Sequence, residues 1–158
     1  MDPVSAIGLA SAILSFITFS HHVLARLAEF NSNINGIPKS LQGLKTELPL
    51  LIDVFDRVEK QTSSGYHEKF TRLAVKSVLD RCNDQVNKLE RILEETLPPP
   101  GAGWVDRSVK ALKSLDRDEK LQEIEKELDR CKQTLILHQV TGEHRNERNG
   151  MRSFFALF

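Results

Sequence analysis

The sequence predicts an all-α protein, an up-and-down bundle of four long helices with an apolar N-terminal helix and a last helix that is bent or split. Apolar residues recur at alternating three- and four-residue steps in four segments, the spacing that buries one face of a helix. No segment alternates apolar and polar residues long enough to form a strand. Clusters of turn residues separate the segments, and short connections favour antiparallel neighbours.

Composition limits the class of protein. The chain has 158 residues, of which 40% are apolar and 28% charged, as expected for one folded domain. Lys+Arg and Asp+Glu both number 22, so the formal net charge is zero. This argues against nucleic acid as a partner. The two cysteines do not make a disulfide scaffold, which favours a reduced, intracellular protein.

The first helix is expected to begin at Asp2 and Pro3, a capping residue followed by a residue suited to the first turn. It should run to about Phe30, before Asn31-Ser32-Asn33. One apolar stripe comprises Leu9, Ile13, Phe16, Ser20, Val23, Leu27 and Phe30, and a second comprises Ile7, Ala10, Leu14 and Ile17. A helix apolar nearly all round is buried or in lipid, so a bundle would place it centrally.

The second and third helices each carry one apolar stripe. The second begins near Pro38, and Pro49 should kink or locally break it. The third runs from about Tyr66 to Glu95 and stops before Pro98-Pro99-Pro100-Gly101. The stripes are Leu41, Leu44, Leu48, Leu51, Phe55 and Val58 in the second helix, and Val75, Leu79, Cys82, Val86, Leu89 and Leu93 in the third.

The last helical region begins near Trp104 and should bend or restart at Asp116-Arg117-Asp118. Gly142 is its expected end. Its second part carries the stripe Leu121, Ile124, Leu128, Cys131, Leu135 and His138. We therefore assign residues 1–142 to the helical bundle and 143–158 to a short C-terminal tail or linker.

Signals for chemistry are weak, and we predict no enzyme and no catalytic, cofactor-binding or metal-binding residues. The segment Gly36–Ser40 resembles a phosphate loop only faintly, because Pro38 replaces the required glycine and no strand precedes it. Adjacent His21 and His22 point about 100° apart on a helix and cannot share a metal. Cys82 and Cys131 lie on apolar stripes, where buried small side chains are expected.

The uncharged run from Val4 to Phe19 is the most informative feature. A signal peptide would carry positive charge before this run, but Asp2 stands there. The run has about 16 residues against the roughly 20 of a stable membrane span. Small residues four apart, such as Gly8 and Ala12, permit close helix packing in lipid or in a tight core. The candidate membrane-active residues are Val4, Ile7, Gly8, Leu9, Ala12, Ile13, Leu14, Phe16, Ile17 and Phe19.

A second candidate surface is a patch for lipid headgroups. Basic residues recur at helical spacing beside a tryptophan, a side chain suited to the membrane interface. The patch comprises Trp104, Arg107, Lys110, Lys113 and Arg117. Acidic residues follow at once, which favours the alternative of a solvated face with Trp104 capping the bundle.

Three blocks of the sequence resemble the HeLo-like N-terminal domains of fungal NLR-type (STAND) receptors and related cell-death proteins. They are "MDPVSAIGLASAIL", "IPKSLQGLKTEL" and "WVDRSVKALKSLDRDEKLQEIEKELDRCKQTLILH", and the resemblance spans about Met1 to Gly142. It implies a helical bundle that executes regulated cell death, in immunity or heterokaryon incompatibility. The activated domain would homo-oligomerise on a signal from an attached receptor or amyloid-type trigger and attack the plasma membrane through its N-terminal helix.

The sequence and the resemblance together lead to one hypothesis and one alternative. The hypothesis is a non-enzymatic, pore-forming domain without cofactors, which moves from the cytoplasm to anionic lipids of the plasma membrane and permeabilises them. The alternative is a soluble helical adaptor that binds protein partners through faces of the bundle. In the adaptor the first helix would stay buried permanently.

Overall fold

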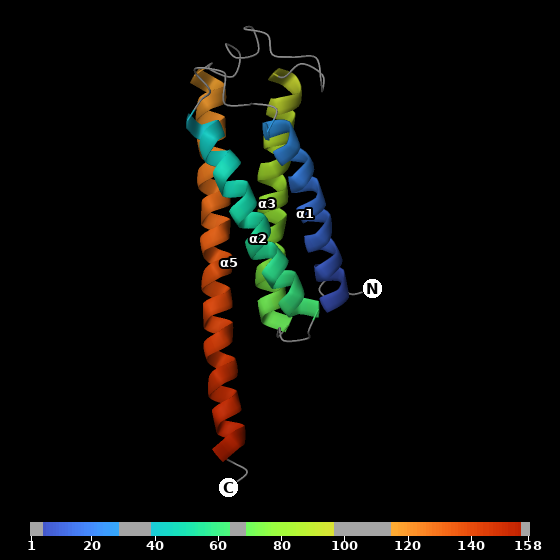
Figure 1. Ribbon diagram of the computed structural model, residues 1–158, viewed down its shortest axis with the longest axis vertical. Coiled ribbons are helices and arrows are strands. Elements are labelled where there is room, and N and C mark those ends of the chain that lie inside the picture. Colours follow the sequence, from blue (N-terminus) through green and yellow to red (C-terminus); the bar gives the residue numbers. More distant parts are fainter. Residues whose placement is uncertain (1–4, 29–38, 64–68, 97–114, 156–158) are drawn as a thin grey trace.

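Four helices account for the part of the chain that the computed structural model describes, residues 5–28, 39–63, 69–96 and 115–155. They are α1 (Ala6–Ala28), α2 (Lys39–Ser63), α3 (Lys69–Thr96) and α5 (Leu115–Phe155) (Figure 1). These ranges contain no strand, which confirms the predicted all-α class.

The chain runs up and down the bundle, since each helix is antiparallel to the one before it (Figure 1). Its four sides are formed by α1 with α2, α2 with α5, α5 with α3, and α3 with α1. Helices α1 and α5 therefore lie on opposite sides of the molecule. Helix α1 forms one corner of this square, so the expectation that the most apolar helix is central is wrong.

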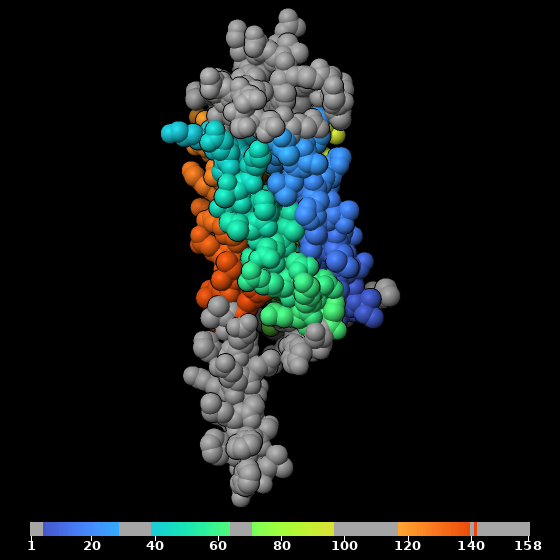
Figure 2. Space-filling view, in the orientation of Figure 1, coloured from blue at the N-terminus to red at the C-terminus, as the bar shows by residue number. Residues whose placement is uncertain are grey.

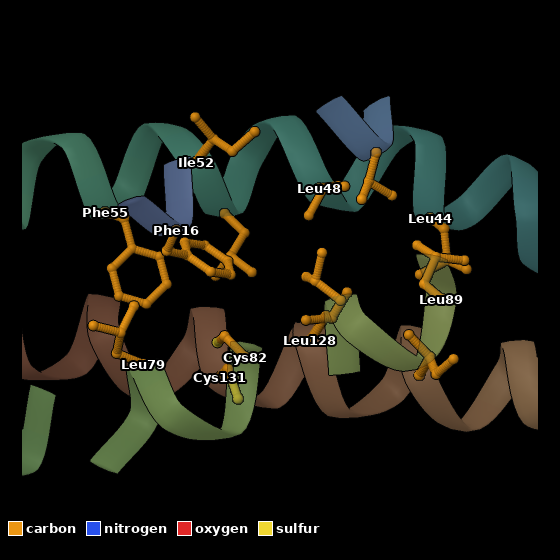
Figure 3. Packing of buried hydrophobic residues seen from close by; sticks show 14 of the residues in the cluster. Phe16, Leu44, Leu48, Ile52, Phe55, Leu79, Cys82, Leu89, Leu128 and Cys131 are labelled. Carbon is orange, nitrogen blue, oxygen red and sulfur yellow. The ribbon is translucent and has the colours of Figure 1, made fainter. Parts of the chain in front are cut away.

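The interior is a single apolar core built from all four helices. In α2, α3 and α5, every described residue of the predicted stripes is buried except His138, which is half-buried. The described residues of the first α1 stripe are buried too, whereas Ile7 and Leu14 of its second stripe are exposed. Phe16 of α1 and Phe55 of α2 meet in this core with ring centroids 4.8 Å apart and planes tilted by 59° (Figure 3). The three- and four-residue spacing thus identified the inward face of α2, α3 and α5, and one of two candidate faces of α1.

Helix α1 begins with a serine cap. The Ser5 Oγ accepts a hydrogen bond from the Gly8 backbone N–H at 3.1 Å, and the Ser5 carbonyl accepts one from the Leu9 N–H at 2.9 Å. These bonds satisfy N–H groups that the first turn of a helix leaves without partners. The start expected at Asp2 and Pro3 falls outside the described residues, and the cap that the structure shows is Ser5.

Helix α2 continues through Pro49, so the expected local break does not occur. The ring of Pro49 lies on the exposed face. Proline has no N–H to donate to the carbonyl four residues earlier, and that residue, Lys45, is exposed. Buried Leu48 and Leu51 on either side of Pro49 hold the helix against the core.

Helix α5 is described from Leu115 onward, directly after undescribed residues, so the restart expected near Asp116 stays a prediction. The first part expected from Trp104 lies outside the described residues. The end expected at Gly142 is wrong, because the helix continues to Phe155 and extends well past the other three helices (Figure 1). A glycine inside a helix costs only about 1 kcal/mol relative to alanine, which neighbouring helix-forming residues can offset.

Polar pairs join α5 to both of its neighbours. Ser40 donates a hydrogen bond to Asp118 Oδ1 at 2.7 Å, and Lys132 forms an ion pair with Glu47, so two contacts link α5 to α2. Two ion pairs link α5 to α3, Arg81 with Glu127 at 2.8 Å and Arg117 with Glu95 at 3.7 Å.

Candidate functional site: the outer face of helix α1

Helix α1 has two apolar faces with opposite surroundings. The inner face is the first predicted stripe, and its described members are fully buried. The outer face carries Ile7, which is 75% exposed, and Leu14, which is 49% exposed. Ala12, Ile17 and Phe19 lie between these faces and pack partly against the core. A large apolar side chain left in water offers binding energy to any apolar partner.

The outer face borders a shallow groove of about 410 Å³ between the first turns of α1 and the end of α2. Figure 2 shows α1 and α2 side by side along this face of the molecule. The groove is lined by Ala6, Ile7, Ala10, Ser11, Leu14, Thr62 and Ser63. Small residues on α1 leave this space open, because none of them fills the gap beside the last turn of α2.

Hydroxyl groups on the outer part of α1 satisfy their own hydrogen bonds. Ser15 Oγ donates to the Ser11 carbonyl and Thr18 Oγ1 donates to the Leu14 carbonyl, each at 3.0 Å. Such bonds within a helix need neither water nor another chain. They reduce the cost of moving a serine- or threonine-containing helix into lipid, where every polar group needs an internal partner.

The length of α1 also suits a membrane. Its 23 residues extend roughly 35 Å at about 1.5 Å per residue, which exceeds the ~30 Å hydrocarbon core of a bilayer. Helix α1 passes the length and composition test for a span, the one helix in the described ranges that does. The core helix of a soluble protein, or a signal sequence near the N-terminus, can have the same length and composition.

The structure divides the predicted membrane-active residues into groups. Leu9, Ile13 and Phe16 belong to the core, whereas Ile7 and Leu14 face outward. Gly8 is half-buried, and Val4 lies outside the described residues. The sequence separates these groups into two stripes but could not tell which stripe faces the core, because both stripes are apolar.

The predicted headgroup patch falls almost entirely outside the described residues, namely at Trp104, Arg107, Lys110 and Lys113. Its remaining member, Arg117, is partly buried and pairs with Glu95 of α3. The patch therefore stays a prediction, and its one described member also serves a contact between helices.

Other predicted features have structural explanations. Ser40, from the faint phosphate-loop resemblance, is buried and bonded to Asp118. His21 and His22 are exposed, and His22 Nε2 lies 3.9 Å from Glu90 Oε1 of α3. Among the described residues, no group of three His, Cys, Asp or Glu side chains is arranged to hold a metal.

Sequence reasoning missed two features of this site. Thr62 and Ser63 border the groove, although they lie far from α1 in sequence, and no spacing pattern reveals which helix end packs there. Ser20 lies on the inner stripe as predicted, but its hydroxyl is fully buried and has no hydrogen-bond partner among the described residues. A buried hydroxyl without a partner costs about 1–3 kcal/mol, so Ser20 weakens the attachment of α1.

Comparison with known families gives one match. Residues 10–135 match the model of SesA, described as the N-terminal domain on NACHT NTPases and P-loop NTPases. No significant match was found among curated proteins or solved structures. The matched range includes most of α1 and reaches into α5, and it agrees with the resemblance to N-terminal domains of fungal NLR-type receptors. Domains in that position are signalling or effector domains, and the chain belongs to the SesA family.

Proposed function

We propose that this domain is a membrane-targeting effector of regulated cell death, in which α1 detaches from the bundle and inserts into an anionic membrane. The observation that carries the proposal is the outer face of α1. Ile7 and Leu14 are exposed on a helix long enough to span a bilayer. First contact with lipid can therefore begin before any core residue moves.

The energy of the core decides how α1 can leave. Its inner face buries five large apolar side chains, those of Leu9, Ile13, Phe16, Val23 and Leu27. Exposing them to water would cost roughly 8–15 kcal/mol, at about 1.5–3 kcal/mol each. That equals the whole stability of a typical domain, about 5–15 kcal/mol. Release must therefore be coupled to burial in lipid or against another copy, because free detachment in water is too costly.

Helix α1 is suited both to burial in lipid and to burial against another copy of the chain. In lipid, the inner and outer faces would contact acyl chains together, and the Ser15 and Thr18 hydroxyls would keep their bonds to the helix backbone. Gly8 and Ala12 would let copies of α1 approach closely, which supports a homo-oligomer in the activated state. The proposed sequence of events is a signal from an NLR-type receptor or an amyloid-type trigger, relocation from the cytoplasm to the plasma membrane, and permeabilisation.

Dye release from anionic vesicles tests this proposal. We expect the wild-type chain to release dye and Leu14→Glu to release little, because a carboxylate on the outer face opposes contact with lipid. Leu50→Glu on α2 is the matched control, since Leu50 is 48% exposed and Leu14 is 49% exposed. The control should release dye like the wild type. Removal of residues 1–20 should also abolish release, with circular dichroism reporting whether that shortened chain folds.

Three outcomes would contradict the proposal. They are no release by the wild type with or without a trigger, equal release by all variants, and equal loss in Leu14→Glu and Leu50→Glu. A domain that never affects vesicles, yet loses binding to a protein partner in Leu14→Glu, would be the soluble adaptor. In that case α1 stays docked, which its fully buried inner face favours.

A further inference from the structure

The two cysteines of the chain meet in the core, far apart in sequence but opposite each other across α3 and α5. Cys82 of α3 and Cys131 of α5 are both fully buried free thiols. Figure 3 shows their side chains directed toward one another. They lie close enough for the Cys82 thiol to form a hydrogen bond with the Cys131 sulfur. No other cysteine in the chain can compete for either partner.

Their surroundings give the two thiols different roles. The hydrogen bond from Cys82 lowers the pKa of Cys131, and the nearby positive charge of Arg81 acts in the same direction. Burial and the negative charge of Glu127 oppose both. The same hydrogen bond and burial raise the pKa of Cys82. Arg81 is held beside the pair by Glu127 at 2.8 Å. Cys131 is thus the better nucleophile, because a thiolate reacts and a thiol does not.

We propose that Cys82 and Cys131 are an oxidation site that forms an intramolecular disulfide and fastens α3 to α5 when a peroxide is present. The Cys131 thiolate attacks one peroxide oxygen, the O–O bond breaks and hydroxide leaves, which gives a sulfenic acid. The Cys82 sulfur then attacks the Cys131 sulfur, the S–O bond breaks and a second hydroxide leaves. With the two thiol protons, one hydrogen peroxide becomes two water molecules and the thiols become one disulfide.

This modification site is independent of the proposed membrane activity. Helix α1 contacts α2 and α3, whereas the disulfide joins α3 to α5, so the bond fastens the part of the bundle that α1 would leave behind. Both sulfurs are buried, and reaction requires brief local opening of the α3–α5 contact. A small oxidant such as hydrogen peroxide should therefore react faster than glutathione disulfide.

The test is oxidation of the folded chain with hydrogen peroxide, followed by alkylation and peptide mapping without reduction. We expect a monomer that has lost two hydrogen atoms and contains one peptide pair joining Cys82 to Cys131. The oxidised form should melt about 5–15 °C above the reduced form, and a thiol reductant should reverse the shift. Cys82→Ala and Cys131→Ala should show neither the joined peptides nor the shift.

An Arg81→Gln variant supplies a second readout. It should form the same disulfide more slowly at neutral pH and approach the wild-type rate as pH rises, because the thiolate of Cys131 loses a stabilising charge. The proposal is overturned if folded wild-type protein keeps two free thiols or goes only to sulfinic acid. It is also overturned if disulfides form only between chains, or if the oxidised monomer melts below the reduced one.

Discussion

Helices α1 and α5 lie on opposite sides of the bundle and are attached to it by different interactions. Helix α1 is held mainly by the apolar inner face that packs on α2 and α3, and His22 Nε2 lies 3.9 Å from Glu90 Oε1 of α3. Helix α5 has a comparable stripe, and in addition ion pairs and hydrogen bonds from Asp118, Glu127 and Lys132 to α2 and α3. Apolar burial has no direction, so lipid can replace it, whereas paired charges and hydrogen bonds need specific partners. Under the proposed function, this difference selects α1 as the helix that leaves the bundle and α5 as the helix that stays.

The largest expected effect comes from the inner face of α1. Phe16→Ala should lower the free energy of unfolding by about 3–5 kcal/mol, because it leaves a cavity beside Phe55. Ile7→Ala on the outer face should change it by less than about 0.5 kcal/mol. Urea unfolding followed by circular dichroism measures both. Equal losses would show that the two faces of α1 do not differ in attachment.

The polar attachment of α5 should respond to loss of Lys132. Lys132→Met should cost about 1–3 kcal/mol in urea unfolding, because Glu47 loses its partner between α2 and α5. Burial opposes the charge on Lys132, but its hydrogen bonds to Glu47 and Asp129 outweigh burial and raise its pKa. A raised lysine pKa contributes stability that is lost as pH rises through the folded value. The cost of Lys132→Met should therefore shrink in strongly alkaline buffer, and a pH-independent cost would contradict this explanation.

Replacing Ser20 should strengthen the attachment of α1 to the bundle. Ser20→Ala removes a buried hydroxyl that has no partner in the described part of the chain, and it should raise the free energy of unfolding by about 1 kcal/mol. It should also slow dye release from vesicles. Thr62→Val is the control, because the buried Thr62 hydroxyl donates to the Val58 carbonyl at 2.8 Å and its removal should give no gain. A destabilised Ser20→Ala would mean that the hydroxyl has a partner.

The smallest expected effect concerns Glu125, whose carboxylate lies over Gly43 where α2 and α5 approach closely. Burial, with Glu47 and Asp129 nearby, raises the pKa of Glu125. The folded state therefore holds this proton more tightly, and the carboxylate destabilises the fold as pH rises through the folded pKa. Glu125→Gln should add under about 1 kcal/mol at neutral pH. The gain should disappear in acid, where thermal melts of both proteins should coincide.

The sequence predicted helix faces better than helix neighbours. Stripes such as Leu44, Leu48 and Leu51 follow from the helical repeat alone, and all are buried. Which helices are adjacent depends on interactions between distant segments, so neither the position of α1 at a corner nor the groove at Thr62 could be read from spacing. The contact between Cys82 and Cys131 could not be predicted either. It depends on the register of α3 against α5, and the apolar stripe of one helix gives no information about that register. The helix end predicted at Gly142 is wrong because the weak preference of glycine against helix interiors is outweighed by the helix-forming residues around it.

The proposed movement of α1 can be tested directly by measuring a distance between spin labels. In a Cys82→Ala, Cys131→Ala background, Ser15→Cys on α1 and Glu123→Cys on α5 place labels at two exposed positions on opposite sides of the bundle. Double electron–electron resonance should give one narrow distance distribution in solution. On anionic vesicles that are releasing dye, detachment of α1 predicts a different and broader distribution. An unchanged narrow distribution on such vesicles would contradict the account, because membrane damage would then occur with α1 still docked.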